Sequence, residues 1–469
     1  MNRTMAKVGK VGFFFLMSFL ILFLSFWLSI APIYTAIFLI LPIFTIIAFI
    51  KFRLAVLLLP FFAAGFIPKQ LTPTFFIAGG KVGVEDCVLV LLIIICLIRI
   101  FFGKNRFTND PLYYPFYFFF LLCILATFMA LVYSNKPALL LVELRTVAYY
   151  IFVFLLSISI QNQKDLSFSL NFIVILSVLI SLTVIIQSFT GIQIRSYGSV
   201  ELLNTIDKDT NTGVLRSRFG GLIYMAIFSF NYILARVARK EISVLVGVLV
   251  LSIIGFAVLV TFGRGAWMAF FVSILVLSVW LGRQSFIKIW VVLLTIGLAG
   301  VLISLAIKPE FIGVVVDRAL SVSEEIEVGG SVAWRKFENE EAMRTIKNKP
   351  ILGAGLGGEY RRGENNSIMG NYDTIMLHNS WLWLMLKFGI VGILFPIWLV
   401  MTVFYKAKEL GTSLSIAAAA SLLAPIVVST TQMEWATPFG ILNITIIVGF
   451  LVAHSNLLKE EKHERTKTH

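Results

Sequence analysis

The sequence predicts an all-α polytopic membrane protein with about 12–14 transmembrane helices. Hydrophobic residues make up 59% of the 469 residues and charged residues only 14%. Soluble domains, by contrast, carry about 25% charged residues. The apolar residues form continuous runs, which exclude the alternating pattern of a membrane β-barrel. An α-helix needs about 20 such residues to cross the hydrocarbon core.

The apolar runs mark the predicted helices in order along the chain. They cover residues 11–30, 32–50, 54–67, 86–102, 113–133, 138–160, 169–190, 221–235, 242–262, 266–281, 289–307, 377–404, 414–432 and 438–457. The third, eighth and tenth runs are shorter than a full span. The first run follows a basic start but is too long for a signal peptide, so we expect it to stay attached as the first span.

The short loops on one side of the predicted bundle are basic. With a cytoplasmic N-terminus, these inside loops contain Lys51 and Arg53, Lys104 and Arg106, Lys164, residues 236–240, Arg283 and Lys288, and Lys406 and Lys408. This is the distribution that the positive-inside rule requires. The formal net charge of +14 is therefore explained by topology, and we expect no nucleic-acid partner.

Two polar segments interrupt the apolar pattern on the predicted outer side. The shorter is an external loop, and the longer is expected to form a partly helical cap between the helices near 289–307 and 377–404. The predicted regions are N-terminal transmembrane helices 1–307 with external loop 191–220, cap 308–376, C-terminal transmembrane helices 377–457 and cytoplasmic tail 458–469.

The segments that partly resemble metal-binding or nucleotide-binding motifs lack residues that those motifs require. The segment "DKDTNTG" begins like a calcium loop, but Thr212 stands where that loop needs glycine and Arg218 where it needs glutamate. The turn "PILGAGLGG" lacks the Lys-Ser/Thr ending of a phosphate-binding loop. Cys87, Cys96 and Cys123 have no disulfide or zinc spacing. We expect neither a metal nor a cofactor.

His378, in "MLHNSWLWLML", is the only histidine in the first 453 residues and lies at the mouth of an apolar run. Histidine is the side chain best suited to accept a proton near neutral pH, so His378 is the candidate general base. The structural alternative is an interfacial side chain bonded to a neighbouring carbonyl.

Several arginines on the outer side are candidate anion ligands. Arg264 lies between two glycines in "FGRGAW", and Arg216 and Arg218 lie where the first external loop meets its following helix. Arg335 lies in a predicted helix over 334–349 whose apolar side contains Trp334, Phe337, Ala342 and Ile346. A guanidinium group grips phosphate oxygens bidentately. The alternative for Arg264, Arg216 and Arg218 is snorkelling to the headgroups, and for the helix of Arg335 it is an interfacial amphipathic helix.

Three motifs occur in a characteristic order: "FGRGAW", then "WRKFENEEAMRTIKNKPILGAGLGG", then "HNSWLWLMLKFGIVGIL". Together they resemble the C-terminal region of the bacterial O-antigen ligase and polysaccharide polymerase superfamily, over roughly residues 257–396. The resemblance implies a polytopic glycosyltransferase of the cytoplasmic membrane whose active site faces outside. It would move glycans from an undecaprenyl diphosphate carrier to a glycan, lipid or wall acceptor without metal or nucleotide sugar.

The resemblance also implies roles for individual residues. His378 matches the family's catalytic histidine, and Arg264 its arginine after the central helix. Arg218, or alternatively Arg216, matches the arginine before the preceding helix. Arg318 and Arg335 occupy places where the family often has arginine. These four arginines would bind the diphosphate.

The residue types suit this chemistry independently. A lipid diphosphate leaves once its charge is neutralised, and an acceptor hydroxyl needs a base. Two other classes stay open: a lipid-linked glycan flippase or transporter, and a non-catalytic component of a polysaccharide export complex. A flippase is expected to carry charged residues along an aqueous path, and Arg99, Glu143, Arg145 and Glu434 are the candidates for one. The motifs do not separate polymerase from ligase.

Overall fold

The computed structural model describes residues 44–66, 75–77, 80–103, 109–194, 200–202, 215–217, 221–307, 312–316, 331–360 and 374–467. It confirms an all-α polytopic membrane protein. In these residues six helices are long and apolar enough to cross a membrane, and five apolar helices are shorter. The expected helix at 11–30 and most of that at 32–50 lie outside the described residues.

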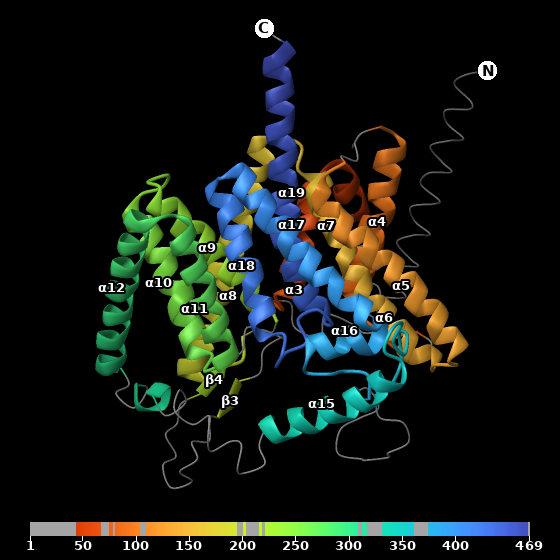
Figure 1. The fold of residues 1–469 in the computed structure, drawn as a ribbon. Helices are drawn as coiled ribbons and strands as arrows, with labels where there is room; N and C mark the ends of the chain where they lie inside the picture. Colours follow the sequence, from red (N-terminus) through yellow and green to blue (C-terminus); the bar gives the residue numbers. More distant parts are fainter. Residues whose placement is uncertain are drawn as a thin grey trace, which may run out of the picture.

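The first half of the chain forms a helical layer and two small hairpins (Figure 1). Its helices are α3 (Phe52–Ala63), α4 (Val84–Phe101), η2 (Pro111–Tyr113), α5 (Tyr114–Val132), α6 (Pro137–Ala148), η3 (Tyr149–Ile151), α7 (Phe152–Ser159) and α8 (Gln163–Thr190). The antiparallel hairpins pair β1 (Phe75–Ile77) with β2 (Gly80–Val82), and β3 (Val200–Leu202) with β4 (Leu215–Ser217).

The second half supplies the remaining bundle and a helix that lies across one end of it. Its elements are α9 (Ile223–Ala238), α10 (Val244–Val260), α11 (Arg264–Trp280), α12 (Arg283–Ile307), α15 (Ser331–Asn348), α16 (Ser380–Phe388), η4 (Ile390–Ile393), α17 (Leu394–Leu410), α18 (Ser413–Val428) and α19 (Pro438–Lys467). α15 lies below α16 in Figure 1, at the end opposite the C-terminus. From here on, the cap means α15 with the turn 349–360, which lies within the cap predicted over 308–376.

Close packing of small and apolar residues holds the centre of the bundle. Residues 417–420 of α18 are four alanines without solvent exposure, and α18 packs against both α9 and α11. Small residues let helix backbones approach closely, which is how helices associate in lipid. α19 runs through the core and continues to Lys467, so residues 458–467 of the predicted tail extend that helix.

The apolar run predicted as one helix over 377–404 is divided in two. α16 ends at Phe388, Gly389 adopts φ 69°, and η4 leads into α17. A Cβ at Gly389 would lie 1.9 Å from the carbonyl oxygen of Ile351. The break therefore exists because the cap turn passes directly against this backbone, a contact that hydropathy does not reveal.

The "PILGAGLGG" turn caps the end of α16. The amides of Ala354 and Gly355 donate to the carbonyls of Leu386 (2.6 Å) and Lys387 (3.2 Å), which the helix itself leaves without partners. Gly353, Gly355 and Gly357 all have positive φ, and a Cβ at each would meet the backbone of another segment at 2.6–2.7 Å. Glycine is required here for close approach, not for phosphate binding.

A buried ion pair lies under this turn. Lys387 Nζ is 2.9 Å from Glu143 Oε1, and the two side chains are 0% and 6% exposed. Trp383 Nε1 and the Gly357 amide also donate to Glu143, and Lys387 donates to the Gly358 carbonyl. The pair joins α6, α16 and the cap turn at one point.

Removing one partner of this pair should destabilise the fold strongly. Lys387→Met leaves a buried carboxylate uncompensated, and we expect the free energy of unfolding to fall by about 3–5 kcal/mol. The double variant with Glu143→Gln should recover much of that loss, because the neutral amide oxygen still accepts hydrogen bonds. Unfolding in mixed detergent–SDS micelles measures both. The exposed Lys408→Met is the control, and a Lys387→Met variant as stable as this control would contradict the prediction.

Candidate functional site

His378 lies just before α16 and contacts a carboxylate that the sequence analysis did not single out. Its Nδ1 is 2.9 and 3.2 Å from the two carboxylate oxygens of Glu338 on α15. The His378 side chain is 42% exposed, whereas that of Glu338 is 3% exposed. An ionised carboxylate only accepts, so in a neutral imidazole held this way Nδ1 carries the hydrogen and Nε2 keeps its lone pair. We call these two residues the dyad.

Glu338 belongs to the buried stripe of α15. It shares that stripe with Ala342 and Ile346, at spacings of four residues, and all three are at most 3% exposed. Ala342 and Ile346 were expected on the apolar side, but Phe337 is 37% exposed. The sequence signal that could have identified Glu338 was its position one helical turn before Ala342, on the same face of the helix.

Asn379 and Ser380, which follow the histidine, have structural partners. The Asn379 side chain accepts from the Leu382 amide and forms the N-cap of α16. Ser380 donates its amide to Ser429 O (2.7 Å) and its hydroxyl to Gln432 O (2.7 Å). These bonds attach the start of α16, and with it His378, to the connector of residues 429–437 between α18 and α19.

Arg264 lies on the opposite side of the same connector. It is the first residue of α11 and is half-buried. A Cβ on the adjacent Gly265 would lie 3.2 Å from Gln432 Nε2 and 3.9 Å from Thr431 Oγ1, so the start of α11 lies directly against the connector. The structure thus brings the segments of Arg264 and His378 together around Gln432, at the cap end of the bundle.

The connector also buries an acidic side chain. Burial raises the pKa of Glu434 to about 8, and a hydrogen bond with Tyr224 lowers it in part. Tyr224 belongs to α9, and its hydroxyl lies 3.4 Å from Gln432 Oε1. Glu434 is therefore a neutral hydrogen-bonding group near neutral pH and packs the connector against α9.

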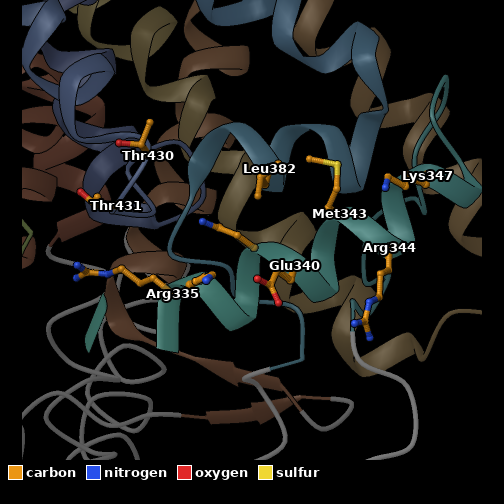
Figure 2. A pocket seen from close by; sticks show the side chains of 10 residues that line it. Arg335, Glu340, Met343, Arg344, Lys347, Leu382, Thr430 and Thr431 are labelled. Carbon is orange, nitrogen blue, oxygen red and sulfur yellow. The ribbon is translucent and has the colours of Figure 1, made fainter. Parts of the chain in front are cut away.

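A basic groove runs between α15 and the connector (Figure 2). Its volume is about 690 Å³, and its lining residues are Arg335, Lys336, Asn339, Glu340, Met343, Arg344, Lys347, Leu382, Thr430 and Thr431. Arg335 lies at the end near Thr430 and Thr431, whereas Arg344 and Lys347 lie toward the other end. The predicted ligand Arg335 thus borders an open groove instead of the protein core.

An apolar chamber of about 580 Å³ separates α12 from α10 and α11. Trp267 of α11, Phe256 of α10, and Gly297 and Gly300 of α12 are among its lining residues. A Cβ at Gly297 would meet no atom within 4 Å, so there is open space beside this face of α12. Trp267 lies one helical turn after Arg264, which places the chamber next to that arginine along α11.

The structure describes only one of the three remaining predicted arginines. Arg216 lies in β4, where it pairs in register with Glu201 of β3. Arg218 and Arg318 lie outside the described residues, as does the segment 207–213. Within the described ranges, no three His, Cys, Asp or Glu side chains are grouped so that they could hold a metal.

Comparison with known protein families identifies residues 247–397 as matching the family described as O-antigen ligase. The match runs from α10 to the start of α17 and includes Arg264, Glu338 and His378. It confirms the resemblance predicted over 257–396. No curated protein matches the chain.

Glu434 should make stability fall with rising pH. In the unfolded chain the carboxyl loses its proton near its ordinary pKa of 4.5, whereas in the fold it keeps the proton to about pH 8. The free energy of unfolding should therefore decrease between these values and level off above them. Glu434→Gln should lack this decrease, and unfolding at pH 5, 6.5 and 8 measures it. The exposed Glu409→Gln should behave as wild type; a decrease that survives Glu434→Gln would show that another group causes it.

Proposed function

We propose, from the premise that this chain carries an O-antigen ligase region, that it is a membrane glycosyltransferase of the O-antigen ligase or polysaccharide polymerase kind. It transfers a glycan from an undecaprenyl diphosphate carrier to an acceptor hydroxyl. The observation that supports this most directly is the dyad, a half-exposed histidine oriented by a buried carboxylate. The same pairing orients histidine in many general-base sites.

In the proposed reaction His378 acts on the acceptor. Its Nε2 removes the proton of the acceptor hydroxyl while that oxygen bonds to the anomeric carbon of the donor sugar. The bond between this carbon and the diphosphate oxygen breaks, and the lipid diphosphate leaves with the electron pair. Glu338 holds the Nδ1–H tautomer and stabilises the imidazolium that forms.

Arg264 is the proposed ligand of the diphosphate. Its guanidinium sits at the N-terminal end of the 17-residue helix α11, where the helix dipole also favours negative charge. Both effects stabilise the charge that develops on the leaving diphosphate. Arg216, Arg218, Arg318 and Arg335 stay proposed as further ligands.

The apolar chamber is the proposed place of the carrier's isoprenoid tail. Its walls are almost wholly apolar, it borders α12, and it begins one turn from Arg264. A diphosphate at Arg264 could therefore extend its tail between α11 and α12 without exposing it to water.

The charges in the spans favour a transferase over a flippase. Glu143 pairs with Lys387, Arg145 lies 3.4 Å from Asp86, and Arg99 donates to the carbonyl of Phe49 at 2.6 Å. These groups tie helices together and do not define an aqueous path. The basic loops lie at the opposite end of the bundle, which by the positive-inside rule supports a dyad on the outer face.

Loss of either dyad residue should slow transfer strongly while the fold persists. We expect His378→Ala to lower kcat by about 10³-fold, within the range of general-base catalysis. Glu338→Gln should lower kcat by about 10²-fold with little change in KM, because its amide can donate to Nδ1 and so favour the wrong tautomer. Product formation by purified protein with undecaprenyl diphosphate glycans measures both.

Glu409→Gln, which removes an exposed carboxylate far from the dyad, is the control. It should turn over as wild type does. Near-normal turnover by His378→Ala would remove this histidine from catalysis.

Filling the chamber should impair the use of long-chain donors. Gly297→Phe places a ring in the open chamber, and we expect KM to rise for an undecaprenyl donor but much less for a donor with two isoprene units. Thr295→Phe puts the same ring on a different side of exposed α12 and serves as the control. Equal effects of Gly297→Phe on both donors would place the tail elsewhere.

A further inference from the structure

The basic groove has a charge distribution that the donor does not explain. Four cationic side chains line it, against the single carboxylate of Glu340. They are spread from Arg335 to Lys347, which is roughly 18 Å along α15 at 1.5 Å per residue. A diphosphate is compact and needs converging donors, so it could engage one end of this groove only. The cations instead suit an extended anion.

The lining between the cations contains both hydrogen-bonding and apolar side chains. Asn339, Thr430 and Thr431 offer amide and hydroxyl groups, and Met343 and Leu382 are the apolar members of the lining set. This mixture suits a sugar chain, whose hydroxyls need hydrogen bonds along its length. It suits a bilayer surface poorly, since membrane-surface helices present a broad apolar face beside their cations.

One end of the groove meets the proposed active site. Thr431 borders the groove and also lies against Gly265, next to Arg264. Leu382 borders it from α16, one turn after His378. Glu338 faces the protein from the other side of α15. A chain lying in the groove would thus have its end near the segments that carry the dyad and Arg264.

We infer that this groove binds the acceptor glycan and selects acceptors that carry acidic groups along the chain. The inference rests on the proposed transferase function and adds the acceptor class to it. Lys336 and Lys347 supply charge-assisted hydrogen bonds to carboxylate or phosphate substituents, and Arg344, which also pairs with Glu341 at 2.7 Å, adds to the positive charge at the same end of the groove. Glu340 opposes them and limits how tightly the product is held.

Two oligosaccharides of equal length test this on the full chain in phosphatidylcholine nanodiscs. Wild type should bind tetragalacturonate at least about tenfold more tightly than neutral maltotetraose, since one charge-assisted bond is worth about that factor. The double variant Arg344→Gln/Lys347→Gln should lose this preference and leave maltotetraose binding unchanged. Glu340→Gln should strengthen tetragalacturonate binding, because it removes the opposing charge. Lys408→Gln, an exposed lysine at the opposite end of the bundle, should have no effect.

Equal binding of the two sugars by wild type would overturn the inference. So would acidic binding that ignores the groove variants. A thermal shift caused by phosphatidylglycerol and lost in the double variant, without oligosaccharide binding, would make the groove a headgroup site instead. These binding measurements need no turnover. Absence of product with any acceptor would therefore count against the transferase and not against the groove.

Discussion

The buried pair of Glu143 and Lys387 fixes the position of the cap. Neither charge is stable alone in a low-dielectric interior, so α6 and α16 are joined at the depth where these side chains meet. The remaining hydrogen bonds come from the cap turn, through the Gly357 amide and the Gly358 carbonyl. Displacing the turn would leave both charges incompletely bonded. α15, which directly precedes the turn, is thereby anchored at its C-terminal end.

This anchoring carries through to the dyad. Glu338 is on α15, and His378 directly precedes α16, so both helices that meet at the dyad are fixed by the same ion pair. Ala342 and Ile346 seat α15 with its carboxylate turned inward, and Ser380 ties the start of α16 to the connector. In the proposed role, a histidine that meets the acceptor hydroxyl in one orientation benefits from such rigid support on both sides. The glycines of the turn serve that purpose, since each allows a backbone contact that a side chain would prevent.

Hydropathy was sufficient to predict most of the fold, and the rarity of histidine and of outer-side arginine singled out two candidate site positions. The apolar runs gave the helices, and His378 and Arg264 followed from their unusual placement at helix ends. The break at Gly389 could not be predicted, because it depends on the backbone of Ile351 packing against it. Glu338 was missed because a helical wheel shows only which side of the helix a residue occupies. It does not show that a carboxylate on the buried side has His378 as its partner. Both omissions concern contacts between segments distant in sequence, which no local pattern contains.

The proposed chemistry divides between two parts of the molecule. Arg264 and the chamber belong to α10, α11 and α12, which suit a donor that is half lipid and half anion. Glu338 and the groove belong to opposite sides of α15, which suit a water-soluble acceptor and the base that activates it. The connector lies between these parts and touches both, through Gly265 on one side and Ser380 on the other. Its tight packing, with Glu434 buried as a neutral group, keeps donor and acceptor elements in register. In this arrangement the acceptor preference can change on the outer side of α15 while the donor site stays as it is.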